Sequence, residues 1–257
     1  MRPSFRPLLL TLALLASAAL AGCATPPPAD DPDAIAEFKE NNDPLEPTNR
    51  FFYQVNDALD TVLLKPLAIG YRGLLPAPLL TGVHNALSNL GAPVVLANDV
   101  MQGKPQRAGH TLTRFVINST IGVGGLIDVA TDLGWPGHDA DFGMTLAVWG
   151  VPDGVFLFLP VLGPSNPRDA VGFGVDTFGL DPWGWVGKGV TVSDLRLTRT
   201  GVSAVDTRAG FLDDLDKLKA QALDPYATIR SLSRQFRAGK IEDARGDVTG
   251  TAVKKSP

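Results

Sequence analysis

Residues 142–174 read FGMTLAVWGVPDGVFLFLPVLGPSNPRDAVGFG, and this stretch constrains the fold more than any other part of the chain. It contains an apolar run over residues 155–162, and no lysine or arginine occurs between Arg114 and Arg168. The run is far shorter than the roughly 20 apolar residues that a bilayer-spanning helix needs. Two interpretations remain, which are burial in a protein core and insertion into one leaflet of a membrane.

Within this stretch we expect side chains that face a membrane and a segment that moves. Trp149, Phe156 and Phe158 are the candidate membrane-facing residues, because tryptophans and apolar groups collect where protein meets lipid. Glycines recur at short intervals, and ordering them costs more backbone entropy than ordering other residues. A rigid segment would avoid this cost, so these glycines are candidate hinges of a moving gate. Close packing of helices is the alternative role for the same glycines. The candidate hinge residues are Gly143, Gly150, Gly154 and Gly163, with Gly172 and Gly174 beyond them.

Composition excludes several classes of protein. The 257 residues carry a net charge of −4, which argues against nucleic-acid binding by bulk electrostatics. The apolar content of 44% predicts a folded chain, which we interpret as a single domain. One cysteine cannot form an internal disulfide and the three histidines are scattered, so the sequence predicts no metal site and no cofactor.

The N-terminal residues have the pattern of a secretory signal. Two arginines precede an apolar stretch over residues 8–19, so residues 1–22 take no part in the predicted fold. Leu-Ala-Gly-Cys at residues 20–23 resembles the bacterial lipobox, in which the cysteine is acylated, for example with palmitate, and becomes the mature N-terminus. Cys23 is therefore the predicted lipidation site, and residues 23–42, which are rich in proline, predict an extended tether.

Helical periodicity dominates the rest of the chain. Apolar residues recur at three- and four-residue steps after Asp43-Pro44, which we expect to cap a first helix. A second periodic segment ends at Gly91, and a third begins after Pro105. Frequent prolines break the chain into short pieces, which favours an all-α fold built as a ring or curved stack of short amphipathic helices.

The C-terminal part is more highly charged. Residues 206–218 and 224–237 carry apolar stripes among charges of both signs, as expected of helices that pack on one face and are solvated on the other. Residues 238–257 are rich in small and polar residues and predict a disordered tail. The folded domain is therefore expected over residues 43–237.

Motifs for catalysis are absent or incomplete. Ile127 stands where the third glycine of a dinucleotide loop would follow Gly122-Val123-Gly124-Gly125, so close packing or a bend is our interpretation of these glycines. A triad would require a nucleophile such as Ser165 to meet His110 or His138 in space, and we interpret the chain as no enzyme. Five acids match no calcium loop and are interpreted as helix caps or surface residues. They are Asp128, Asp132, Asp139, Asp141 and Asp153.

A series of short motifs, in matching order from residue 43 to residue 237, resembles the MlaA (VacJ) family of outer-membrane lipoproteins. The opening block is NDPLEP at residues 42–47. The later motifs lie at residues 49–50, 56, 59–60, 65–66, 70–72, 82–83, 85, 89–90, 98, 102–104, 114–115, 118–122, 141–143, 145–146, 149–151, 159–160, 162–165, 168–169 and 224–226.

This resemblance implies a mostly helical, ring-shaped protein with a central polar channel, lying monotopically in the inner leaflet of the Gram-negative outer membrane and facing the periplasm. It implies that phospholipids mislocalised to the outer leaflet pass through the channel to a periplasmic phospholipid carrier protein, which maintains lipid asymmetry. It also implies a trimeric porin as a partner. The alternatives are a structural lipoprotein that tethers porins or envelope proteins without moving lipid, and a phospholipase.

We expect Cys23→Ser to abolish acylation and membrane anchoring while leaving the domain folded, because Cys23 precedes the predicted domain. Several acyl chains together anchor a protein firmly, since each buried CH₂ contributes about 0.8 kcal/mol. Labelling with radioactive palmitate, followed by cell fractionation, measures both effects. A serine variant that incorporated palmitate as the wild type does would contradict the assignment.

Overall fold

Helices make up most of the structure, a computed structural model that describes residues 42–184 and 190–246 together with residues 28, 31, 35 and 38. The predicted signal peptide and Cys23 lie outside these residues. The predominantly helical fold expected from the sequence is confirmed, with one small β-hairpin added. In chain order the elements are α3 (Glu46–Leu59), the π-helix η1 (Asp60–Leu64), α4 (Lys65–Leu74), α5 (Ala77–Met101), α6 (Pro105–Thr120), α7 (Val129–Asp132), α8 (Phe142–Val148), β1 (Leu157–Leu159), β2 (Gly163–Ser165), α9 (Pro167–Val175), the π-helix η2 (Asp176–Leu180), the 3₁₀-helix η3 (Pro182–Gly184), α10 (Val190–Gly210), α11 (Leu212–Gln221) and α12 (Pro225–Arg245).

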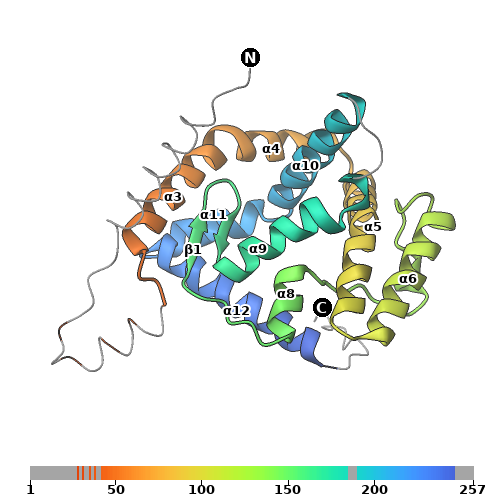
Figure 1. Cartoon of the computed structure of the whole chain (residues 1–257). Helices are drawn as coiled ribbons and strands as arrows, with labels where there is room; N and C mark the ends of the chain where they lie inside the picture. The colour runs from red at the N-terminus through yellow and green to blue at the C-terminus, as the bar shows by residue number, and fades with distance from the viewer. Residues whose placement is uncertain are drawn as a thin grey trace, which may run out of the picture.

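The helices follow a curved path (Figure 1). In this view α3 and α4 run along one side, α10 packs against α4, and α5 with α6 forms the far end. In the middle lie α8 and α9, which pack on each other, while α12 crosses the side opposite α4 and contacts α8. Within the described residues, no helix is both long enough and apolar enough to cross a membrane.

Two helix ends differ from the sequence prediction. The second helix does not end at Gly91, because α5 continues through Gly91 and Pro93 to Met101. Pro93 removes one helical donor and crowds the preceding turn. In that turn the carbonyl of Leu90 accepts a hydrogen bond from Trp183 Nε1 at 3.1 Å, so tertiary contact stabilises a helix that local sequence would break.

The last helix extends beyond the predicted domain. Residues 238–245 were expected to be disordered, but they form the final two turns of α12, so this part of the prediction is wrong. Lys104 Nζ donates to the carbonyl of Arg245 at 2.9 Å and Ala244 is fully buried. These contacts with the turn between α5 and α6 stabilise a segment whose composition is typical of a tail. Residues 247–257 lie outside the described part of the chain.

The apolar run forms the hairpin, in which β1 pairs antiparallel with β2 and Phe158 lies opposite Pro164. Phe156 and Phe158 are only 4% and 5% exposed. Their ring centroids lie 6.3 and 6.2 Å from that of Tyr226 in α12. The prediction that these two phenylalanines face a membrane is therefore wrong. Burial in the protein, the other interpretation of this run, is the one the structure supports.

Asp43 lies beneath the same cluster and does not cap a helix, since the residue at the N-cap of α3 is Leu45. The buried Asp43 carboxylate accepts hydrogen bonds from the hydroxyl of Tyr226, from Arg230 at 2.8 Å and from Asn49 at 2.7 Å. Burial, together with the neighbouring Asp43 carboxylate, raises the pKa of Tyr226 well above its usual range. The phenol therefore keeps its proton and acts as a donor.

One asparagine of α3 pairs with the outer edge of β1. The Asn49 amide nitrogen donates to the carbonyl of Phe156 at 3.0 Å, and its oxygen accepts from the backbone N–H of Phe158 at 2.8 Å. A single side chain thus supplies the donor and the acceptor that a residue of a neighbouring strand would supply.

The same arrangement recurs one step along the hairpin. Asn56 donates to the carbonyl of Leu159 at 2.9 Å and accepts from the N–H of Val161 at 2.8 Å. Asn42, seven residues before Asn49, donates to the carbonyl of Gly154 at 2.6 Å. Residues 42, 49 and 56 are spaced by seven. The segment that contains them therefore follows the outer edge of the hairpin from Gly154 to the turn at Val161.

The spacing has a geometric reason. Seven helical residues rise about 10.5 Å, and three strand residues rise about 10 Å. Asn49 and Asn56 on α3 therefore meet backbone groups that lie three residues apart on the hairpin. The match sets the position of α3 along β1.

We expect Asn49→Ala to lower the free energy of unfolding by about 2–5 kcal/mol, because each buried backbone group left unpaired costs about 1–3 kcal/mol. Gln54→Ala, on an exposed position of the same helix, is the matched control and should change stability by less than about 0.5 kcal/mol. Chemical denaturation in mild detergent measures both variants. Equal stabilities of the two variants would show that the asparagine contacts contribute nothing.

Candidate functional site

Large apolar side chains are exposed over much of the described surface. Water-soluble monomers rarely expose contiguous apolar patches larger than a few hundred Å², so a surface of this kind indicates an apolar partner. The exposed residues include Phe51 and Leu59 on α3, Val62 and Leu63 on η1, Leu67, Ile69 and Leu74 on α4, Leu112 and Val116 on α6, Ile121, Val123, Leu126, Ile127 and Leu133 after α6, Val171 and Phe173 on α9, and Phe178 on η2.

The connection between α6 and α8 is polar inside and apolar outside. The buried Asn118 donates to Asp128 at 2.8 Å and accepts from the backbone N–H of Ala130 at 2.9 Å. Ile121 and Val123, in contrast, are 66% and 61% exposed. Polar groups inside and apolar groups outside are the reverse of the arrangement in a water-soluble protein, so we expect an apolar medium on the outer side.

Arg114 holds this connection against α6. Its guanidinium donates to both carboxylate oxygens of Asp128 at 3.1 Å, to Thr131 at 2.8 Å and to the carbonyl of Trp135. Burial alone would raise the pKa of Asp128, but the hydrogen bonds from Thr131, Asn118 and Arg114 outweigh it and hold that pKa below its usual range. The Asp128 carboxylate is therefore ionised and shares its charge with Arg114.

Two of the five acids have the capping role that the sequence predicts. Asp128 accepts from the N–H of Thr131 at the start of α7, and Asp141 accepts from the N–H of Met144 at 2.8 Å at the start of α8. Within the described residues no group of three histidine, cysteine or acidic side chains is arranged to hold a metal ion.

The glycines have two different environments. A Cβ atom on Gly172 would lie 2.3 Å from the backbone nitrogen of Gly143, so α8 and α9 cross at a distance that other residues do not permit. Gly143 thus has a packing role, and its role as a hinge stays a prediction. Gly150, Gly154 and Gly163 adopt positive φ, and their role as hinges also stays a prediction.

Arg237 of α12 connects the same crossing to the C-terminal helices. It donates to both oxygens of Asp141 at 2.6 and 2.7 Å and to both oxygens of Asp169 at 2.8 and 2.9 Å. Burial would raise the pKa of Asp169, but Arg237 and Arg168 outweigh it and lower that pKa. One guanidinium therefore fixes α8, α9 and α12 together.

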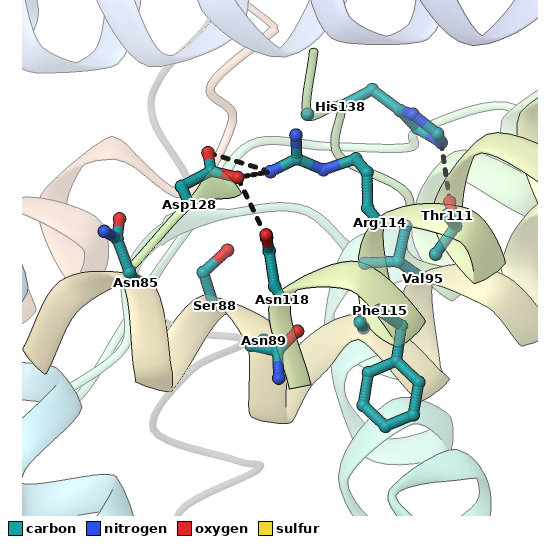
Figure 2. Close-up of a pocket in the computed structure, with 12 residues that line it drawn as sticks. Asn85, Ser88, Asn89, Val95, Thr111, Arg114, Phe115, Asn118, Asp128 and His138 are labelled. Atoms are coloured by element: carbon teal, nitrogen blue, oxygen red, sulfur yellow. Dashed lines mark hydrogen bonds and ion pairs between the residues drawn. The ribbon is translucent and has the colours of Figure 1, made fainter. Parts of the chain in front are cut away.

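A polar pocket of about 70 Å³ lies between α5 and α6 (Figure 2). Side chains from both helices and from the connection after α6 surround it, and the volume is enough for a few water molecules. The Arg114–Asp128 pair forms one wall, and Val95 and Phe115 supply apolar surface at the base. The remaining lining residues are Asn85, Ser88, Asn89, Ala92, Thr111, Asn118, Gly137 and His138.

His138 approaches a buried acid and a hydroxyl in this pocket but does not form a catalytic triad with them. The same ring nitrogen, Nε2, lies 2.9 Å from Asp99 Oδ2 and 3.3 Å from Thr111 Oγ1. Thr111 donates its proton to Asp99 at 2.6 Å. A triad requires the two imidazole nitrogens to contact the acid and the nucleophile separately, so the group stabilises the fold and activates no nucleophile.

Trp149 is 56% exposed, which fits the membrane-facing role predicted for it. Its indole nitrogen donates to the carbonyl of Met101 at 3.0 Å, at the end of α5. Its ring therefore lies on the surface while its polar atom is satisfied, as in tryptophans at a membrane interface. The role itself stays a prediction.

The family model for MlaA lipoproteins matches residues 41–240 of the chain. The chain belongs to the MlaA lipoprotein family. Among the relatives, a Haemophilus influenzae protein is 35% identical, and the match covers 91% of this chain and 90% of that one. An Escherichia coli relative is 32% identical, and the match covers 86% of this chain and 84% of the relative. Both are named intermembrane phospholipid transport system lipoprotein MlaA.

The fold of this MlaA family member also matches a solved structure. That structure belongs to work titled "Structural basis for maintenance of bacterial outer membrane lipid asymmetry". The TM-score is 0.66 at 31% sequence identity, and the match covers 77% of this chain and 98% of the solved one.

The sequence prediction located the exposed apolar residues of this MlaA family member too narrowly. Only Trp149 of the three predicted aromatic residues is exposed, whereas large exposed apolar side chains occur from Phe51 on α3 to Phe236 on α12. The available signal was the periodicity of α3 and α6, whose apolar stripes include Leu59, Leu112 and Val116. Those stripes were recognised, but periodicity did not show that they face outward.

We expect Phe156→Asp to prevent folding in detergent, because it places an unpaired charge in a closed aromatic cluster. Phe51→Asp is the matched variant, since Phe51 is 59% exposed on α3. It should fold normally in detergent but bind membranes less well, since a charge in hydrocarbon costs several kcal/mol. Protease resistance in detergent and flotation with vesicles separate the two effects. Normal folding of the Phe156 variant would contradict the buried assignment.

Proposed function

We propose that this protein removes mislocalised phospholipids from the outer leaflet of the Gram-negative outer membrane, and thereby maintains lipid asymmetry. Membership of the MlaA family and the names of its relatives support transport of phospholipid between membranes. The proposed mechanism is movement of intact lipid, with no catalytic step. The arrangement of Thr111, Asp99 and His138, which lacks triad geometry, agrees with this.

The observation that carries the proposal is the inverted polarity of the described surface and interior. Apolar side chains such as Val62, Val116 and Phe178 are exposed, while amides and ion pairs such as Arg114–Asp128 lie inside. A protein lying in one leaflet needs an apolar exterior against acyl chains and a polar route for headgroups. The proposed location is the inner leaflet of the outer membrane, with the lipid anchor at Cys23.

The proposed route is a central channel. The pocket between α5 and α6, at about 70 Å³, has room for a few water molecules and is too small for a phospholipid headgroup. Passage of a headgroup therefore requires an opening movement. The glycines at positions 150, 154 and 163 remain the candidate hinges for it.

The proposed partners are a trimeric porin, which would hold the protein in place, and a periplasmic phospholipid carrier, which would accept the lipid. The charged C-terminal helices would then face the periplasm. The second candidate function is a structural lipoprotein that tethers porins or envelope proteins and moves no lipid. The small size of the described pocket is the observation that favours this candidate.

A Gram-negative strain lacking its own MlaA family member provides the test. Outer-leaflet phosphatidylethanolamine, measured with an impermeant amine-reactive label, should rise in the deletion strain and return to normal with this protein. Phe51→Asp and Cys23→Ser should fail to restore it. If wild-type protein co-purifies with a porin yet leaves surface phospholipid at the deletion level, the tether is the correct function.

A further inference from the structure

Two copies of one short motif occur in the chain. Residues 60–66 read DTVLLKP and residues 176–182 read DTFGLDP, so both fit the pattern D-T-x-x-L-x-P. Each copy forms a π-helix, η1 and η2, that follows an α-helix without a break. In each, the N–H five residues later bonds to the carbonyl of the first aspartate, from Lys65 in η1 and from Asp181 in η2. The two segments are therefore the same structural unit used twice.

The first aspartates of the two units have different partners. Asp60 accepts from Arg208 at 2.6 and 3.0 Å and from Lys219 at 3.3 Å. Asp176 accepts from the amide of Asn98 at 2.8 Å and from the backbone N–H of Phe142 at 2.9 Å, and both donors are uncharged. Across residues 42–184 and 197–246, no lysine, arginine or histidine forms an ion pair with Asp176.

Charged groups surround Asp176 at longer range. Asp141 at the start of α8 carries like charge, and Arg237 of α12 carries opposite charge, but Arg237 is already bound to Asp141 and to Asp169 of α9. Asp99, on the α5 side, is paired with Arg107 and His138. Among residues 42–184 and 197–246, Arg237 therefore attracts Asp176 only at longer range, and no cation is bound to it directly.

These surroundings shift the pKa values of Asp176 and Asp60 in opposite directions. Burial raises the pKa of Asp176, and its hydrogen bonds from Phe142 and Asn98 do not compensate fully, while repulsion by Asp141 adds to the rise. Burial also acts on Asp60, but Arg208 and Lys219 outweigh it and lower the pKa of Asp60.

We propose that Asp176 is a proton-binding site, so that mild acid tightens the junction at which α5, α8 and η2 meet. A proton from solvent binds one carboxylate oxygen and forms an O–H bond. With the proton on Oδ1, the hydroxyl oxygen can still accept from the amide of Asn98 and Oδ2 still accepts from the N–H of Phe142, while the neutral group no longer repels Asp141. The first copy of the motif lacks this response because its aspartate is held as a carboxylate by two cations.

The pH range of the effect follows from the sign of each shift. A carboxyl whose pKa is raised by folding binds its proton more tightly in the folded state, so stability increases as pH falls toward the unfolded pKa of about 3.9. Asp60, Asp128 and Asp169 have lowered pKa values, and their contribution is complete above about pH 4 and is lost only below it. Above about pH 4, the pH dependence of stability that comes from Asp176 is therefore distinguishable from that of these three acids.

The test compares the full-length wild type with Asp176→Asn in detergent. On acidification from about pH 7 to about pH 4.5, the Tm of the wild type should rise by about 2–4 °C relative to that of the variant. All groups other than residue 176 are the same in the two proteins, so their contributions cancel in the difference. Asp60→Asn is the matched control, which should have a lower Tm throughout but keep the wild-type pH response. Parallel pH profiles of wild type and Asp176→Asn would overturn the proposal.

Infrared spectroscopy of the folded protein with isotope-labelled aspartate gives a second readout. At about pH 4.5 the protonated-carboxyl band of the wild type should exceed that of Asp176→Asn, and the excess should disappear at about pH 7. Equal bands in the two proteins at about pH 4.5 would show that the proposal is wrong. Neither measurement depends on lipid transport, so either can fail while the proposed function holds.

Discussion

The free edge of β1 is the constraint from which much of the structure follows. Each strand of a two-stranded hairpin leaves the N–H and C=O groups on its outer edge without a strand partner, and such groups must be paired when they are buried. Here asparagine amides on α3 pair with them, because the rise of a seven-residue helical step matches three residues of strand. Once α3 is set along β1, Tyr53 lies against Phe158 with their ring centroids 5.5 Å apart. Tyr226 brings α12 onto the same cluster.

Buried ion pairs then position the C-terminal helices against the N-terminal ones. Because so many apolar side chains face outward, little apolar surface remains to hold these elements together. Each pair joins segments far apart in the chain, and breaking a buried pair by removing one partner costs about 3–5 kcal/mol. Such pairs also accept little variation in geometry, so they specify one arrangement of the helices. The buried pairs are Asp43–Arg230 and Asp60–Arg208. Arg237 adds a partly exposed link from α12 to Asp141 and Asp169.

The sequence predicted element types better than element limits. Periodicity correctly indicated α3 and α6, and the aspartates at positions 128 and 141 cap helices as expected. The predicted end at Gly91 was wrong because tertiary contacts support α5 past Pro93, and local propensity is overridden in such cases. The paired D-T-x-x-L-x-P units were visible in the sequence but carry no recognised turn signal. Nothing local in the sequence shows that they form π-helices or that their aspartates differ in partner.

The side to which an apolar helix face points was harder to predict than the periodicity of that face. An apolar stripe shows which face of a helix avoids water, but it does not show whether that face meets the protein or a lipid. The apolar run around Phe158 was interpreted as facing lipid and is buried, while the stripe of α6 with Leu112 and Val116 is exposed. Polar residues decide the question, because an arginine or a buried amide must meet its partner on the protein side. Arg114 and Asn118 bind Asp128 on the inner side of α6, and its apolar stripe is consequently left on the outside.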